Sequence, residues 1–121
     1  MIHLYGIANC DTVKKARAWL AAQGVETTFH DFKREGLDAS RLEAWMGELG
    51  WAPLLNRQGT TWRRLDAGLQ AGVVDAASAA ALMLAHTSVI LRPVVEWRPT
   101  LVTVGFDAAK FAAAAGGPST R

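Results

Sequence analysis

The sequence predicts an α/β fold, with a mixed four-stranded sheet and a group of helices inserted between the second and third strands. Three stretches support this class. Residues 2–32 have the pattern of strand, helix and strand, residues 38–88 carry helical signals, and residues 89–115 contain two closely linked strands and a last helix. With 121 residues, half of them hydrophobic, the chain can bury a core of its own. We expect one domain over residues 1–115, with its insertion at about 38–88.

The N-terminal part has the signals of a βαβ unit. Apolar and polar residues alternate over residues 2–5, which is the period of a strand, and apolar side chains then recur at helical spacing from 13 to 20. Gly24 stands where a left-handed helix cap would fall. Residues 26–32 are rich in Thr and Phe and form the second predicted strand. The crossover helix of such a unit makes its two strands parallel, and the connection is right-handed in nearly all cases.

The insertion is predicted to consist of helices, with a connector that contains Pro53 from Trp51 to Arg57. Asp38 and Gly50 bound an amphipathic pattern whose apolar stripe we interpret as core. A threonine is expected to cap a short helix that starts near Trp62. Asp75 is expected to cap an alanine-rich helix that ends near His86.

The C-terminal part is expected to supply an antiparallel pair of strands. Residues 89–97 and 100–105 have β-favouring composition, and the turn between them is too short for a parallel return. Pro93 has no N–H for a strand ladder, so it marks either the strand start or a cis bend. A capped helix is expected from 107 to about 115, and residues 116–121 are expected to be a disordered tail.

Cys10, the only cysteine, lies at the turn between the first strand and the first helix. The unpaired N–H groups and positive dipole end of a helix N-terminus stabilise a thiolate, which is the reactive form of cysteine. Lys14, one turn on, could add a cation and hold a substrate carboxylate, whereas Asp11 opposes a thiolate. Asn9 either turns its amide toward the sulfur or serves only the turn. The alternative for Cys10 is a small buried apolar residue.

Five blocks of this sequence belong together as a pattern: residues 6–12, 54–57, 59–63, 75–83 and 91–93. In this order they make the chain similar to the arsenate reductase (ArsC)/Spx family, and most similar to its YffB-like branch. The resemblance spans residues 2 to about 113, and it implies a thioredoxin-like fold with a helical insertion, together with cysteine redox chemistry or regulation of transcription.

The resemblance also implies residues of a substrate site. Arg92 corresponds to one of the arginines that arsenate reductases use to bind oxyanion, and Pro93 corresponds to the cis-proline that faces the active-site cysteine in thioredoxin-like proteins. The other two arginine positions fall on Asn56, with Arg57 beside it, and near Gly105. One matched cation where three are expected weakens the arsenate interpretation. The alternative for Arg92 and Arg57 is a solvated surface charge.

Our leading hypothesis is a glutathione-dependent thiol–disulfide oxidoreductase with Cys10 as its nucleophile. Val13 stands where a C-x-x-C motif would place the resolving thiol, so turnover needs a thiol from outside the chain. Glutathione is the expected co-substrate, with no bound cofactor. One alternative is arsenate reduction with glutathione and glutaredoxin. Another is a non-enzymatic regulator of the Spx type that docks on RNA polymerase or another protein.

Composition argues against several other classes of protein. The three histidines lack the spacing of metal ligands, so no metal site is expected. A net charge of +2 suits an anionic small molecule but not nucleic acid, and the basic residues from 14 to 17 have no interleaved aromatic residue. We expect no membrane span, since no apolar run approaches about 20 residues. A single cysteine and the absence of a signal-peptide pattern favour a cytoplasmic protein.

Overall fold

The structure is a computed structural model that describes residues 2–116. Within the described part, the chain forms two compact units. The first is made of residues 2–34 and 92–116, and the second is Glu35–Leu91. The second unit lies in sequence between the second and third strands, where the insertion was predicted at about 38–88. Each unit is described by itself below.

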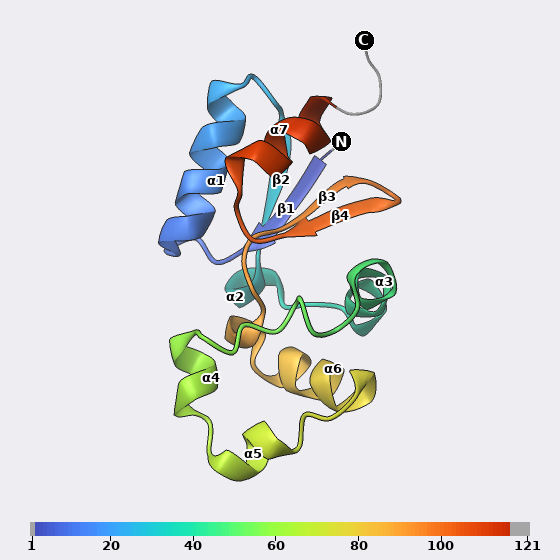
Figure 1. The fold of residues 1–121 in the computed structure, drawn as a ribbon. Helices are drawn as coiled ribbons and strands as arrows, with labels where there is room; N and C mark the ends of the chain where they lie inside the picture. The colour runs from blue at the N-terminus through green and yellow to red at the C-terminus, as the bar shows by residue number, and fades with distance from the viewer. Residues whose placement is uncertain (1, 117–121) are drawn as a thin grey trace. The chain divides into compact units, whose positions relative to one another are not determined.

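The first unit contains a mixed four-stranded sheet, as the sequence predicted (Figure 1). Its strands are β1 (Ile2–Gly6), β2 (Thr27–Asp31), β3 (Val94–Arg98) and β4 (Leu101–Val104), in the order β2-β1-β3-β4. β1 pairs in parallel with β2 and antiparallel with β3, and β3 pairs antiparallel with β4. The predicted βαβ unit and the predicted antiparallel pair are both confirmed.

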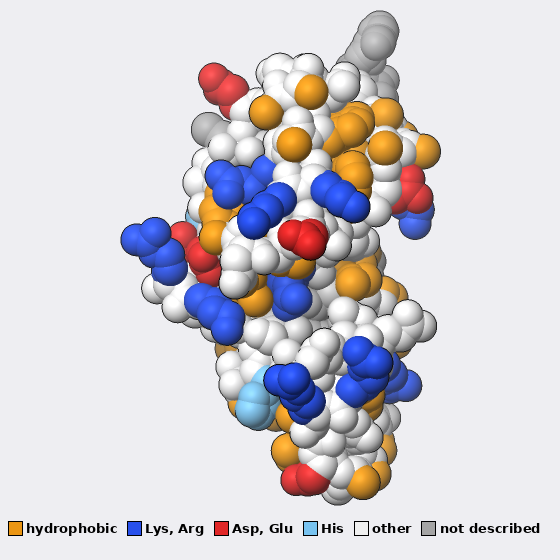
Figure 2. Space-filling view, turned by 90° about the vertical axis from the view of Figure 1, so that its left-hand side faces the viewer, with side chains coloured by type: hydrophobic (Ala, Val, Ile, Leu, Met, Phe, Trp, Pro, Cys, Tyr) orange, Lys and Arg blue, Asp and Glu red, His pale blue; other side chains and the backbone are white. Residues whose placement is uncertain are grey.

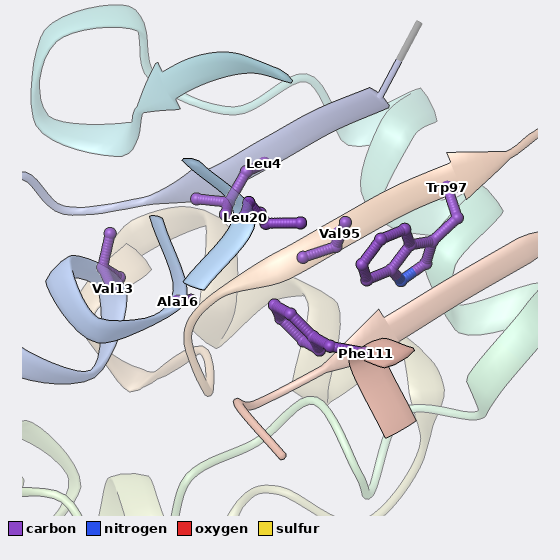
Figure 3. Packing of buried hydrophobic residues seen from close by; sticks show 7 residues of the cluster. All are labelled: Leu4, Val13, Ala16, Leu20, Val95, Trp97 and Phe111. Carbon is purple, nitrogen blue, oxygen red and sulfur yellow. The ribbon is translucent and has the colours of Figure 1, made fainter. Parts of the chain in front are cut away.

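Two helices, α1 (Asp11–Ala22) and α7 (Ala108–Gly116), pack on one face of this sheet. Phe111 of α7 is 1% exposed and lies at the centre of the packing, edge-on to three other aromatic rings. The ring centres of Trp97 and Phe106 lie 5.0 and 4.9 Å from its own. Figure 3 shows the buried cluster, which consists of Leu4, Val13, Ala16, Leu20, Val95, Trp97 and Phe111.

The opposite face of the sheet carries polar and aromatic side chains, because successive residues of a strand point to opposite faces. Tyr5 stacks on His30 with ring centres 4.5 Å apart, and its hydroxyl donates to Glu96 Oε1 at 3.2 Å. His3 Nδ1 and His30 Nε2 are 2.9 Å apart and share a hydrogen bond. The polar residues of β1 are therefore paired with polar residues of the strands on either side.

The second unit is built from helices. They are α3 (Ala39–Leu49), α4 (Thr60–Arg64), α5 (Ala67–Ala71), α6 (Ala76–Ala85) and the 3₁₀ helix η1 (Thr87–Val89). Asp75 begins α6 as predicted, in a capping box: its side chain accepts from the Ser78 N–H at 2.9 Å, and Ser78 Oγ accepts from the Asp75 N–H at 3.1 Å. The apolar stripe predicted for α3 faces the interior of this unit, and its Leu42 and Trp45 are fully buried. Gly50 ends α3 with φ +80°, a conformation that favours glycine.

The predicted third strand at 89–97 was wrong in its first half, because β3 begins only at Val94. The apolar residues 89–91 before it belong to the second unit and bond within that unit. The Leu91 N–H donates to the Leu54 carbonyl at 2.8 Å, and the Asn56 N–H donates to the Val89 carbonyl at 2.8 Å. These contacts were beyond the reach of sequence reasoning, since an apolar run has the same composition whichever strand it meets.

Smaller differences concern element ends. Gly59, and not a threonine, precedes α4, and the short α5 was not predicted. Asp38 precedes α3 as expected but makes no side-chain capping bond. Phe32 opens a four-residue helix, α2 (Phe32–Glu35), and does not extend β2, since Asp31 Oδ1 accepts from the Lys33 N–H at 2.8 Å and turns the chain.

The far C-terminus differs slightly from expectation. α7 runs to Gly116, with Asp107 Oδ1 accepting from the N–H groups of Ala109 and Lys110 at 2.9 and 3.1 Å. The rest of the predicted disordered tail, residues 117–121, lies outside the described residues. None of the helices described here is both long and apolar enough to cross a membrane.

We predict that Phe111→Ala lowers the free energy of unfolding by about 3–5 kcal/mol, because it empties the centre of the first unit's core. Urea unfolding followed by circular dichroism measures the change. Ala112→Ser, at an exposed position of the same helix, is the control and should change stability by about 0.5 kcal/mol or less. Equal losses in the two variants would contradict the central place of Phe111.

Candidate active site

Cys10 occupies the N-cap position of α1, directly after the turn that follows β1. Its backbone is extended, with φ −87° and ψ 126°, as helix N-cap residues usually are. The Cys10 N–H donates to the Ile7 carbonyl at 3.1 Å, and its carbonyl accepts the first helical bond from the Lys14 N–H at 2.9 Å. The side chain is partly exposed and its thiol is free, so the sulfur is fixed in position and still accessible.

The turn between β1 and α1 packs closely on the helix, where Gly6 approaches Val13. A Cβ atom on Gly6 would lie 2.7 Å from Val13 Cγ2, which is closer than non-bonded carbons approach. Val13 is fully buried in the core cluster and cannot move aside. Glycine at the end of β1 therefore lets the first turn of α1, and Cys10 with it, sit directly on the sheet.

Arg92 is the cation beside Cys10. The pairing of β1 with β3, which joins Tyr5 to Val94, places the residues before β3 next to the loop after β1. The Arg92 side chain makes a hydrogen bond to the Cys10 sulfur. The Arg92–Pro93 peptide bond is cis, as one of the two alternatives for Pro93 predicted. The Pro93 carbonyl accepts from the Gly105 N–H at 2.8 Å, which ties this segment to the end of β4.

The surroundings of Cys10 lower the pKa of its thiol. Burial of the sulfur, the largest single influence, raises the pKa, but the Val13 N–H, the Arg92 guanidinium and the Thr12 N–H together outweigh it. The sulfur forms no capping hydrogen bond of standard geometry. We therefore regard the helix N–H groups as partial positive charges near the thiolate, and Arg92 as its hydrogen-bonded partner.

The other predicted site residues belong to three different parts of the fold. Asn9 is exposed in the turn just before Cys10, and Lys14 is exposed on α1. Arg92 is the side-chain cation that contributes to the lowered pKa of Cys10, and Lys14 is not among the contributing groups. Arg57 belongs to the second unit, where its guanidinium lies 5.9 Å from the ring centre of Trp51 and 5.6 Å from that of Trp62. Its role toward Cys10 stays a prediction, as do those of Asn9 and Lys14.

Sequence reasoning did not name the N–H groups of Thr12 and Val13 individually, although it predicted a helix N-terminus at Cys10. The signal was available, since the two residues after the first helical position supply the N–H groups that face an N-cap side chain. For metals, the residues 2–116 contain no group of three or more His, Cys, Asp or Glu side chains arranged to hold an ion.

A family model described as ArsC family matches residues 5–114. The chain belongs to the ArsC family. The resemblance drawn from the five sequence blocks is thereby confirmed, and with it the thioredoxin-like fold with a helical insertion. ArsC proteins are a family of thiol-dependent reductases, which agrees with a site built around one accessible cysteine.

Similar proteins cover nearly the full length of this ArsC-family chain. An uncharacterized protein of Haemophilus influenzae is 37% identical over 114 residues, which are 94% of this chain and 98% of that protein. A solved structure of a protein named YFFB is 47% identical, with a TM-score of 0.89, over 94% of this chain and 98% of that one. An arsenate reductase (ArsC) related protein from Brucella melitensis is 50% identical, with a TM-score of 0.73, over 91% and 90%.

We predict that Cys10 reacts with iodoacetamide at a pH below the ordinary titration range of a free cysteine, whose pKa is about 8.5, because the pKa of Cys10 is lowered. Arg92→Gln should move the rate profile to higher pH and slow the reaction several-fold at pH 7. Arg98→Gln, at an exposed arginine of β3, is the matched control. Identical profiles for the two variants would show that Arg92 does not stabilise the thiolate.

The lowered pKa of Cys10 also predicts how stability depends on pH. The folded protein holds the thiolate more favourably than the unfolded chain, so unfolding takes up a proton between the two pKa values. The free energy of unfolding should therefore rise with pH through the window between the lowered pKa of Cys10 and about 8.5, and level off above it. Urea unfolding at several pH values measures the slope. Cys10→Ser should remove this component, and an unchanged slope in that variant would contradict it.

Proposed function

We propose that this protein is a glutathione-dependent thiol–disulfide oxidoreductase whose nucleophile is Cys10. The Cys10 thiolate attacks the glutathione sulfur of a mixed disulfide between a substrate thiol and glutathione. The old S–S bond breaks, the substrate leaves as a thiolate that takes up a proton, and Cys10 becomes linked to glutathione. A glutathione thiolate then attacks this second mixed disulfide, which releases glutathione disulfide and restores the Cys10 thiolate. The net reaction reduces the substrate disulfide at the expense of glutathione.

The observation that carries the proposal is the placement of the Cys10 sulfur. The sulfur lies at the start of α1 and is partly exposed. The Arg92 guanidinium interacts with it, and the pKa of the thiol is lowered. The thiolate that a lowered pKa favours is a competent nucleophile and also a good leaving group for the second step. A cysteine that served only as core would be buried away from cations, and its pKa would be raised.

Two further features support glutathione as the external thiol. The sequence has one cysteine, so no internal disulfide can complete the cycle, and a free thiol must resolve the intermediate. Glutathione is anionic at neutral pH. Lys and Arg side chains are prominent among the charged groups in Figure 2, and the net charge of the chain is +2. These charges favour an anionic partner over a cationic one.

Arsenate reduction is the second candidate, because the Brucella melitensis structure carries the description arsenate reductase related. An arsenate oxyanion needs several cations, and the arginine placed at Cys10 is Arg92. One charge-assisted bond contributes roughly 1.5–3 kcal/mol, which leaves a multiply charged oxyanion poorly neutralised. Thiol consumption that requires arsenate, with glutathione and glutaredoxin supplied, tests this candidate; its absence would discard it.

We predict that glutathione disulfide at neutral pH converts the protein into an adduct with one glutathione, detected by intact-mass analysis. Cys10→Ser should show no adduct, and Arg92→Gln should form it several-fold more slowly. Added reduced glutathione should remove the adduct, as the second step requires. If Cys10 stays unmodified until the pH is alkaline or the protein is unfolded, its sulfur is an inert core group and the proposed function is wrong.

A further inference from the structure

Two histidines of the first unit meet on the sheet face that carries the polar and aromatic side chains. His3 lies in β1 and His30 in β2, far apart in the sequence. The parallel pairing joins His3 to Thr28 and Tyr5 to His30, so the two histidines point to the same face and are diagonal neighbours. Ligand spacing along the sequence could not show this pair, because it forms across two strands.

The ring nitrogens of this pair lie at the separation of two ligands on one metal ion. His3 Nδ1 and His30 Nε2 are 2.9 Å apart, and the ring centres are 5.1 Å apart. Imidazole nitrogens bind divalent transition metals at about 2.0–2.1 Å, which places two of them about 2.9 Å apart at adjacent corners of a square and about 3.4 Å apart in a tetrahedron. Small rotations of the rings would point both lone pairs at a shared ion, with the strands left in place.

The shared hydrogen bond means that these two nitrogens already face each other. Between neutral imidazoles such a bond needs an N–H on one ring and a lone pair on the other. When the donor ring carries its proton on its second nitrogen instead, both facing nitrogens present lone pairs. A metal ion can then take the place of the bridging proton, and both rings remain neutral, which is the form of histidine that binds metals.

Tyr5 limits the positions that the His30 ring can take. The two rings stack with centres 4.5 Å apart and an interplanar angle of 13°, and Tyr5 is itself only 5% exposed. The Tyr5 hydroxyl donates to Glu96 Oε1 at 3.2 Å, which anchors the stack to β3. A ligand whose ring is held in this way loses little conformational freedom when an ion binds.

Solvent and charge around the pair also suit a cation. Both histidines are partly exposed, so water can reach an ion there and complete its coordination. Glu96 is the ladder partner of His3 and shares its face of the sheet, which puts a carboxylate near the bound dication. Within residues 2–116, no third His, Cys, Asp or Glu completes a ligand set with them. The protein thus supplies two ligands, and water supplies the others.

We propose that His3 and His30 form a binding site for a divalent transition-metal ion, and that Cu²⁺ is the ion it prefers. His3 Nδ1 and His30 Nε2 are the protein ligands, in adjacent positions of a square plane. Cu²⁺ favours this tetragonal geometry, and nitrogen sites bind it more tightly than Ni²⁺ or Zn²⁺. The site uses no residue of the candidate active site, so its test is independent of the proposed function.

Titration of the Cys10→Ser protein with Cu²⁺ tests this site, because the variant has no thiol that could bind or reduce the ion. Electron paramagnetic resonance at one equivalent of Cu²⁺ should show hyperfine coupling to two imidazole nitrogens. His3→Gln and His30→Gln, in the same background, should each weaken binding several-fold or more and remove one of the two couplings. His86→Gln, at the exposed histidine that follows α6, is the matched control and should change neither result.

The His30→Gln variant separates the pair from other copper sites. If it binds Cu²⁺ as tightly as its parent while His3→Gln does not, the ion is held by His3 with nearby backbone nitrogens, and the proposed pair is wrong. Equal losses in His86→Gln and the other two variants would mean scattered binding to single histidines and would also overturn the site. Glutamine can still hydrogen-bond to the remaining imidazole, and circular dichroism checks that each variant remains folded.

A diamagnetic ion gives a second readout that needs no change at the pair itself. Zn²⁺ added to the Cys10→Ser protein should shift the NMR imidazole signals of His3 and His30 together, over the same range of ion concentration. The imidazole signals of His86 should stay in place over that range. A shift of only one of the paired histidines, or an equal shift of His86, would contradict a shared ion.

Discussion

The antiparallel pairing of β1 with β3 is the contact on which the candidate active site depends. It joins Tyr5 to Val94, so the loop that leaves β1 and the segment that enters β3 become neighbours although they are far apart in sequence. The loop carries Cys10, and the segment carries Arg92 and the cis bond to Pro93. β4 extends the same edge through the pairing of Val94 with Val104. The reactive sulfur and its cation therefore come together at one edge of the sheet.

The chemistry at that edge is a balance between opposing effects on Cys10. Partial burial removes water from the sulfur and favours the neutral thiol. The N–H groups of Val13 and Thr12 and the guanidinium of Arg92 favour the thiolate, and together they prevail. The helix contribution is local, since it needs only a helix that starts at residue 11. The position of the helix start is set by packing, because Gly6 lets Val13 approach the end of β1 closely. A side chain at Gly6 would therefore displace both the helix start and the sulfur.

In the second unit, a stretch with the composition of a strand forms its hydrogen bonds outside the main sheet. Residues 89–91 are apolar and β-favouring, yet they bond to Leu54 and Asn56 and form an isolated bridge between Leu55 and Ile90. Only from Val94 onward does the chain join the main sheet. In the same unit Arg57 lies within cation–π distance of Trp51 and Trp62, so its side chain has aromatic neighbours as well as solvent.

Local patterns in the sequence were enough to predict the order of the main elements, the mixed sheet and the helix that begins at Cys10. Alternation, helical spacing and capping residues act between near neighbours, so they can be recognised without knowing the fold; the capping box of Asp75 and Ser78 is an example. Family resemblance added Arg92 as a site residue. Local reasoning also predicted a stabilised thiolate at Cys10 and a cis bond at Pro93 as one of two alternatives. The contribution of Arg92 to the lowered pKa of Cys10, and the choice of the cis form at Pro93, came only from the structure. Each depends on groups that long-range strand pairing brings together, and the strength of such charge interactions is set by distance and burial, which a linear sequence does not contain.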